Sequence, residues 1–88
     1  MDKKEAEKTT RYICNELKEI RNNRHLTQED VAFALNISAG YLSRIENGKL
    51  SNTPMYLFIQ LCDLYQIEFD KLIKRAYAKI NLDNYYKQ

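Results

Sequence analysis

The feature that most constrains this 88-residue chain is a pair of short amphipathic segments between residues 27 and 49. Thr27 is suited to cap the first segment as a helix, because its hydroxyl accepts hydrogen bonds from free backbone N–H groups of a first turn. Two carboxylates follow in that turn, where the helix dipole favours negative charge. Apolar residues at helical spacing then predict a helix of about two turns. These residues are Val31, Ala32 and Leu35.

The next residues predict a tight turn into a second short helix. Asn36 stands where the first helix must stop, and asparagine tolerates the left-handed conformation that such a stop requires. Ser38 is suited to cap the second helix, and Gly48 marks its end. Leu42 and Ile45 are expected to face inward. The residues expected to point outward or sideways are Ala39, Gly40, Tyr41, Ser43, Arg44 and Asn47.

This pattern resembles the helix-turn-helix of the lambda-repressor-like, or XRE-type, family of bacterial and phage DNA-binding proteins. The segment LKEIR at 17–21 resembles the first helix of the family, and IEFDKLI at 67–73 resembles the fifth. The resemblance therefore covers residues 13–73. The matching residues of the central segment are Thr27, Gln28, Glu29, Val31, Ala32, Leu35, Ile37, Leu42, Ser43, Ile45, Glu46, Asn47, Gly48 and Lys49.

The resemblance implies an all-α fold, a five-helix lambda-repressor-like DNA-binding domain, to which this chain adds a C-terminal helical extension. Composition agrees, because one proline, two glycines and the absence of alternating apolar and polar runs favour helices over strands. The first, fourth and fifth helices are expected at about residues 4–23, 54–65 and 69–78. We therefore predict a helix-turn-helix domain at residues 1–76 and an extension at residues 77–88.

The extension and the fourth helix carry more apolar side chains than one small core needs. In the fourth helix, the residues expected to face inward are Met55, Phe58, Leu61 and Cys62, which leaves Tyr56, Leu57 and Leu64 over. The extension is expected to form a further helix or arm that packs on the fourth helix, on a second subunit, or on both. A homodimer is predicted through the fifth helix and the extension. Its candidate contacts are Tyr77, Ile80, Tyr85 and Tyr86.

The resemblance also implies that the helix after Ser38 enters the major groove of double-stranded DNA. The candidate base contacts are Ser38, Ala39, Gly40, Tyr41 and Arg44, and the candidate phosphate contacts are Thr27, Gln28, Ser43, Asn47 and Lys49. Ala39 and Gly40 replace the long base-reading side chains of several family members, so readout must depend on the other residues, on backbone approach or on thymine methyl contact.

Three of these candidates have a second interpretation that the sequence leaves open. Arg44 is either a guanine contact or a surface arginine paired with Glu29 or a phosphate. Tyr41 either contacts the DNA or covers the seam between helices. Gln28 is either part of a phosphate clamp at a helix N-terminus, which we favour, or an ordinary exposed glutamine.

A structural role is implied for two charged residues. In the family, the residues at the positions of Arg21 and Glu46 form an ion pair between the first helix and the end of the third. We expect the pair to be partly buried here and to fix the reading helix on its scaffold.

Composition excludes several other classes of function. Two distant cysteines and one histidine do not form a metal-ligand spacing, and we predict neither a metal nor a cofactor. No nucleophile with a base, carboxylate pair or phosphate loop points to an enzyme. No apolar run reaches membrane-spanning length, and a cytoplasmic protein is expected. The net charge of +2 permits DNA binding without requiring it.

The sequence therefore favours a sequence-specific transcriptional regulator, a repressor that acts as a homodimer on a palindromic operator. Phage-repressor, restriction-modification controller and antitoxin branches of the family remain open. The alternative is a protein-interaction module that uses the same fold to bind a second regulatory protein or a toxin, with weak or no DNA binding. The modest charge, the Ala39-Gly40 pair and the apolar fourth helix support that alternative.

Overall fold

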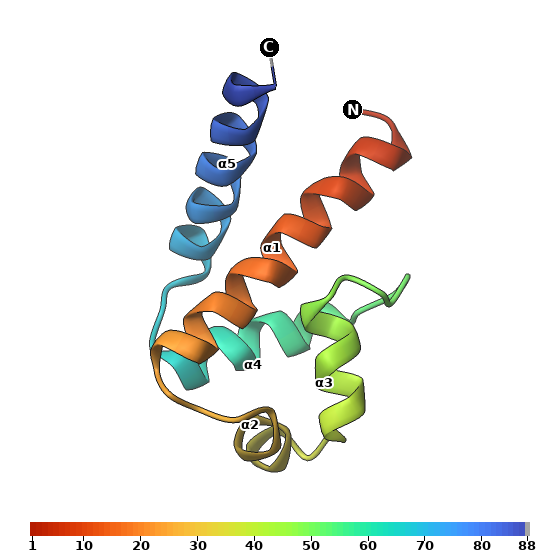
Figure 1. Ribbon diagram of the computed structural model, residues 1–88. Helices are drawn as coiled ribbons and strands as arrows, with labels where there is room; N and C mark the ends of the chain where they lie inside the picture. The colour runs from red at the N-terminus through yellow and green to blue at the C-terminus, as the bar shows by residue number, and fades with distance from the viewer. Residues whose placement is uncertain (88) are drawn as a thin grey trace.

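The computed structural model describes residues 1–87, and within them the chain folds into five helices without strands (Figure 1). The helices are α1 (Lys3–Asn23), α2 (Gln28–Leu35), α3 (Ala39–Glu46), α4 (Met55–Tyr65) and α5 (Phe69–Tyr86). The expected all-α, five-helix architecture is confirmed. None of the helices in this part of the chain is long and apolar enough to cross a membrane.

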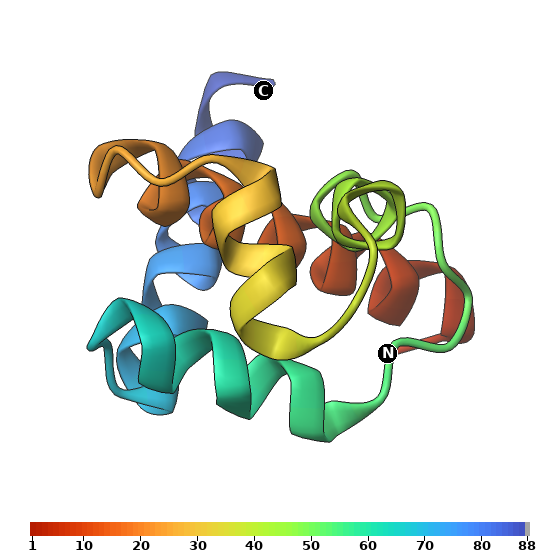
Figure 2. The ribbon, with the colours of Figure 1, turned by 90° about the horizontal axis from the view of Figure 1, so that it is seen from below.

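The short helices α2 and α3 lie at the end of the molecule away from the C-terminus of α5 (Figure 1), and seen from below they lie side by side (Figure 2). Side-chain caps fix where they begin. Thr27 Oγ1 accepts from the N–H of Asp30 at 3.0 Å, and Asp30 returns a hydrogen bond to the N–H of Thr27, so the two form a capping box. Ser38 Oγ accepts from the N–H of Tyr41. Asn36 has φ 57°, which confirms the left-handed stop between the helices.

The core draws side chains from all five helices. Its buried members are Cys14, Leu17, Ile20, Val31, Leu42, Phe58, Leu61, Cys62, Tyr65 and Leu72. Both cysteines are free thiols here, and burial raises the pKa of Cys14 to about 11, so it stays protonated at neutral pH. Residues 1–87 contain no cluster of histidine, cysteine and carboxylate side chains that could hold a metal ion. The cysteines are therefore packing groups.

The inward face of α4 differs from the expected one at three positions. Leu64, expected to be left over, is half-buried and packs against the core. Met55, expected to face inward, is 59% exposed, whereas Leu57, expected to be left over, is buried. Leu57, Leu61 and Tyr65 recur every four residues and therefore share one face of the helix. That face packs into the core, which turns the first residue of the helix toward solvent. The expectation for Tyr56 holds, because this ring is exposed.

The C-terminal extension also differs from its expected placement. Helix α5 runs without a break through residue 76 to Tyr86, so the extension is a continuation of the fifth helix and not a separate arm. It lies along α1, antiparallel to it, instead of on α4 (Figure 1). The hydroxyl of Tyr12 on α1 donates to the carboxylate of Asp83 in the extension. This hydrogen bond joins the extension to α1.

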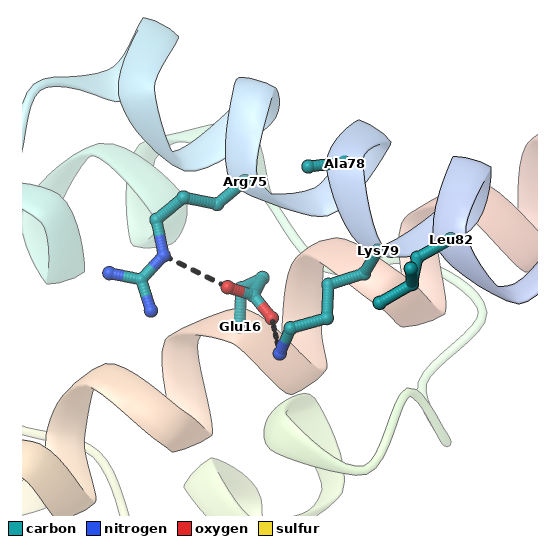
Figure 3. Close-up of a pocket in the computed structure, with 5 residues that line it drawn as sticks. All are labelled: Glu16, Arg75, Ala78, Lys79 and Leu82. Atoms are coloured by element: carbon teal, nitrogen blue, oxygen red, sulfur yellow. Dashed lines mark hydrogen bonds and ion pairs between the residues drawn. The ribbon is translucent and has the colours of Figure 1, made fainter.

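A buried carboxylate, Glu16 of α1, makes the main polar link between α1 and α5 (Figure 3). Its Oε1 accepts from Arg75 Nε at 2.9 Å and its Oε2 from Lys79 Nζ at 2.8 Å. Lys79 also donates to Glu19 at 2.6 Å. These bonds, chiefly the one to Glu16, raise the pKa of Lys79. Two cations of α5 thus bind one carboxylate of α1. A buried carboxylate without such partners would cost free energy, because it would lose its hydration.

We predict that Glu16→Ala lowers the free energy of unfolding by about 1.5–3 kcal/mol, the range for hydrogen bonds to charged groups. The loss should stay within that range because Arg75 and Lys79 are partly exposed and can be hydrated when their partner is removed. Urea unfolding followed by circular dichroism measures it. The matched control is Glu7→Ala, which removes an exposed carboxylate of the same helix. Equal stability of the two variants would contradict a stabilising role for Glu16.

Candidate nucleic-acid interface

The outer face of α3 presents the residues predicted to contact bases. Ser38, Gly40 and Arg44 are exposed, and Ala39 and Tyr41 are partly exposed. Inward-facing apolar side chains on the other side of the helix anchor it to the core. The only carboxylate of α3 is buried below this face. The accessible surface of the helix is therefore neutral to basic, as a surface that approaches DNA must be.

Two candidate base contacts, Tyr41 and Arg44, lie against each other on this face. The guanidinium carbon of Arg44 is 5.9 Å from the centroid of the Tyr41 ring, one helical turn earlier, which is a cation–π geometry. The pairing of Arg44 with Glu29, considered as an alternative, is not formed among the residues that the structure describes. The head group of Arg44 is thus positioned by an aromatic ring and stays accessible to an acceptor.

The N-terminus of α2 lies beside α3. The first backbone N–H groups of a helix have no acceptor within the helix and form an anion site. The side chain of Gln28, however, is half-buried, and its Nε2 donates to Glu46 Oε1 at 3.0 Å. This contact ties α2 to the end of α3. The hydroxyl oxygen of Thr27 accepts the capping bond, which leaves its O–H group free to donate. A phosphate at this end of α2 would therefore meet that O–H group and the free backbone N–H groups of the first turn.

The C-terminal end of α3 carries the remaining candidate phosphate contacts. Asn47 is the C-cap residue, and its Nδ2 donates to the carbonyl of Ser43 at 2.9 Å. Gly48 follows with φ +65°, a conformation that favours glycine, and Lys49 is exposed directly after it. Lys18 of α1, which the sequence reasoning did not single out, donates to Asn47 Oδ1 at 3.4 Å. Lys18 therefore adds a cation from another helix to this end.

The pair expected between Arg21 and Glu46 is formed and is buried. Arg21 Nε donates to Glu46 Oε2 at 2.7 Å, and Nη2 donates to Oε1 at 3.1 Å. Its Nη1 donates to the carbonyl of Leu26 at 2.7 Å. The hydrogen bond to Glu46 is the main reason that the pKa of Arg21 is raised. One guanidinium thus connects α1, the segment that leads into α2, and the end of α3.

Comparison with known protein families decides the class of the fold and of the site. The model of a helix-turn-helix family, HTH_3, matches residues 17–72, from the second half of α1 to the start of α5. The chain belongs to this XRE-type helix-turn-helix family. The family consists of DNA-binding regulators, and the resemblance predicted from the sequence is confirmed. The helix-turn-helix of this protein is the segment from α2 to α3.

One curated relative shares sequence with this helix-turn-helix protein over a limited stretch. The glutamine–fructose-6-phosphate aminotransferase (isomerizing) of Methanocaldococcus jannaschii is 35% identical over 63 residues, which are 72% of this chain. The same residues are 6% of that protein. This chain therefore spans only a small part of the relative's length.

We predict that Glu46→Ala lowers the free energy of unfolding by about 3 kcal/mol, because the charge of Arg21 is left buried without its partner. Urea unfolding of both proteins measures the loss. The matched control is Asp70→Ala, which breaks the exposed pair with Lys74 and should cost about 0.5 kcal/mol or less. A loss for Glu46→Ala as small as that of the control would contradict the scaffold role of the pair.

Proposed function

We propose that this helix-turn-helix protein is a sequence-specific transcriptional repressor that binds a palindromic operator as a homodimer, with α3 in the major groove. The observation that carries the proposal is the outer face of α3. Its exposed side chains are neutral or basic, its carboxylate is buried, and a buried ion pair holds its orientation. A rigid helix of this character can read base edges in the groove.

The proposed contacts divide by their place around α3. The base contacts are Ser38, Ala39, Gly40, Tyr41 and Arg44, which lie on the outer face or at its start. The phosphate contacts are Thr27, Gln28, Ser43, Asn47 and Lys49, which lie at the N-terminus of α2 or along α3 toward its C-terminal end. Among the base contacts, Arg44 has the only cationic side chain, and a guanidinium forms paired hydrogen bonds with guanine O6 and N7.

The proposed dimer uses the C-terminal part of α5. Tyr85 and Tyr86 are 71% and 76% exposed, their rings pack edge to face, and Tyr77 is also exposed nearby along the helix. Ile80 is half-buried and lines a hollow with Tyr77 against the first part of α1, where a partner would cover its remaining exposed surface. Exposed aromatic clusters of this kind are typical of association surfaces. Two-fold symmetry would place two copies of α3 about 34 Å apart, one turn of the duplex.

A second candidate function is supported by a different surface. Phe33 of α2 is 90% exposed, and Met55, Tyr56 and Ile59 of α4 are also exposed. These side chains would suit a protein that binds a second regulatory protein and has little affinity for DNA. Binding of the purified protein to genomic DNA fragments at several salt concentrations separates the two candidates. Affinity that falls steeply with salt supports DNA binding, whereas salt-independent weak binding supports the protein-interaction function.

We predict that Arg44→Ala reduces discrimination at one base pair of a selected operator by about 1–3 kcal/mol, because a bidentate guanine contact is lost. Lys49→Ala is the matched control, since loss of a phosphate contact should weaken operator and random DNA alike. Titration of fluorescent duplexes with single base changes measures both. Equal loss on operator and random DNA for Arg44→Ala would show that Arg44 contacts only the backbone.

We predict that the double variant Tyr85→Glu, Tyr86→Glu shifts the protein toward monomer and weakens operator binding, because charge is placed in the proposed dimer contact. Both side chains are exposed, so the melting temperature measured at a concentration where the wild type is monomeric should change little. Sedimentation equilibrium at tens of micromolar measures association. Tyr56→Glu on α4 is the control and should remain dimeric. A wild-type monomer at these concentrations would refute the dimer.

A further inference from the structure

Four cations lie on one face of α1 outside the helix-turn-helix. They are Lys4, Lys8, Arg11 and Lys18, and they are called the α1 cation stripe below. Their spacing of four, three and seven residues keeps them within an arc of about 80°, at roughly 100° per residue. Lys4, Lys8 and Arg11 are exposed, and Lys18 is partly exposed. The face opposite this arc packs against the rest of the molecule.

The stripe is continuous with the C-terminal end of α3. Arg11 packs directly over Gly48, so closely that a Cβ added there would lie 2.5 Å from Arg11 Cγ. Farther along the stripe, Lys18 Nζ donates to Asn47 Oδ1. The N-terminal half of α1 thus continues past the end of α3 and the loop that follows it (Figure 1). Arg11 and Lys18 therefore lie against the end of α3, where exposed Lys49 follows in the chain and the carboxylate of Glu7 lines the same seam.

Pairing distinguishes the stripe from three of the cations of α5. On α5, Lys74, Arg75 and Lys79 all have carboxylate partners. Within residues 1–87, by contrast, no carboxylate lies within 4.0 Å of a charged nitrogen of the stripe. Three cations of α5 therefore have carboxylate partners within the protein, whereas the four cations of the stripe have none among residues 1–87. The net charge of +2 is a total, so it does not show that these unpaired cations are gathered on one face of α1.

We propose that the α1 cation stripe is a second DNA-backbone surface, which binds phosphates that flank the groove occupied by α3. The proposal rests on the DNA binding proposed above and extends it to residues outside the helix-turn-helix. The stripe is about 21 Å long, at 1.5 Å per residue. Duplex DNA carries one negative charge per about 1.7 Å of its axis, so a stripe of this length can face several phosphates. It adds affinity that does not depend on sequence.

The test is the salt dependence of binding to a 30-base-pair duplex of random sequence. The variant Lys4→Gln, Lys8→Gln, Arg11→Gln should lower the slope of log affinity against log salt by about 2–3, because each lost phosphate contact contributes roughly 0.9. The control Lys71→Gln, Lys74→Gln, Lys87→Gln removes the same charge from exposed positions of α5 and should leave most of the slope. The charge-keeping variant Lys4→Arg, Lys8→Arg, Arg11→Lys should retain the wild-type slope.

Each outcome separates this proposal from the proposed function. Wild-type binding with an unchanged slope in the α1 variant would overturn the stripe and leave the helix-turn-helix contacts standing. Equal losses in the α1 and α5 variants would show an effect of net charge and would also overturn the stripe. Failure of the wild type to bind any duplex would overturn both proposals. Circular dichroism melts of all variants should lie close together, because the substituted side chains are exposed and the pair of Lys74 with Asp70 is exposed as well.

Discussion

The buried pair of Arg21 and Glu46 is the interaction on which the arrangement of the helix-turn-helix depends. Each charge is removed from water, and such a pair is tolerated only when the remaining donors and acceptors are also satisfied. Here they are, because the carboxylate also accepts from Gln28 and the guanidinium also donates to a carbonyl before α2. The same set of bonds joins α1, α2 and α3, so the orientation of α3 is set by hydrogen-bond geometry as well as by apolar packing.

Helix α1 is the scaffold to which both ends of the molecule attach. Its C-terminal half holds α3 through Arg21, and its middle holds α5 through Glu16, whose buried carboxylate is shared by two cations. Arg24, just after α1, donates to the carbonyl of Tyr65 at the end of α4, where the helix dipole favours a cation. Helix α5 contacts α1 more than any other helix, so a change in α5 would reach α3 chiefly through α1. Dimerisation through α5 would use this route.

The distribution of charge explains how a nearly neutral protein can bind DNA. The carboxylates of α1 that face α5 form ion pairs with cations of α5. The cations on the outer face of α1 have no such partner among residues 1–87. Phosphate binding depends on the local density of unpaired cations more than on net charge. The reason is that each cation that contacts a phosphate releases counterions from the DNA. The surfaces around α3 and along α1 are therefore compatible with DNA despite the net charge of +2.

Sequence alone determined the helix-turn-helix, because its signals are local: the caps Thr27 and Ser38, the left-handed Asn36 and the periodic apolar residues act within a few positions. The family resemblance supplied the Arg21–Glu46 pair. Tertiary structure decided which face of α4 is buried and where the extension packs, because an almost wholly apolar helix has no preferred face of its own. It also decided that α1 continues the surface of α3, since the approach of Arg11 to Gly48 joins residues far apart in the chain.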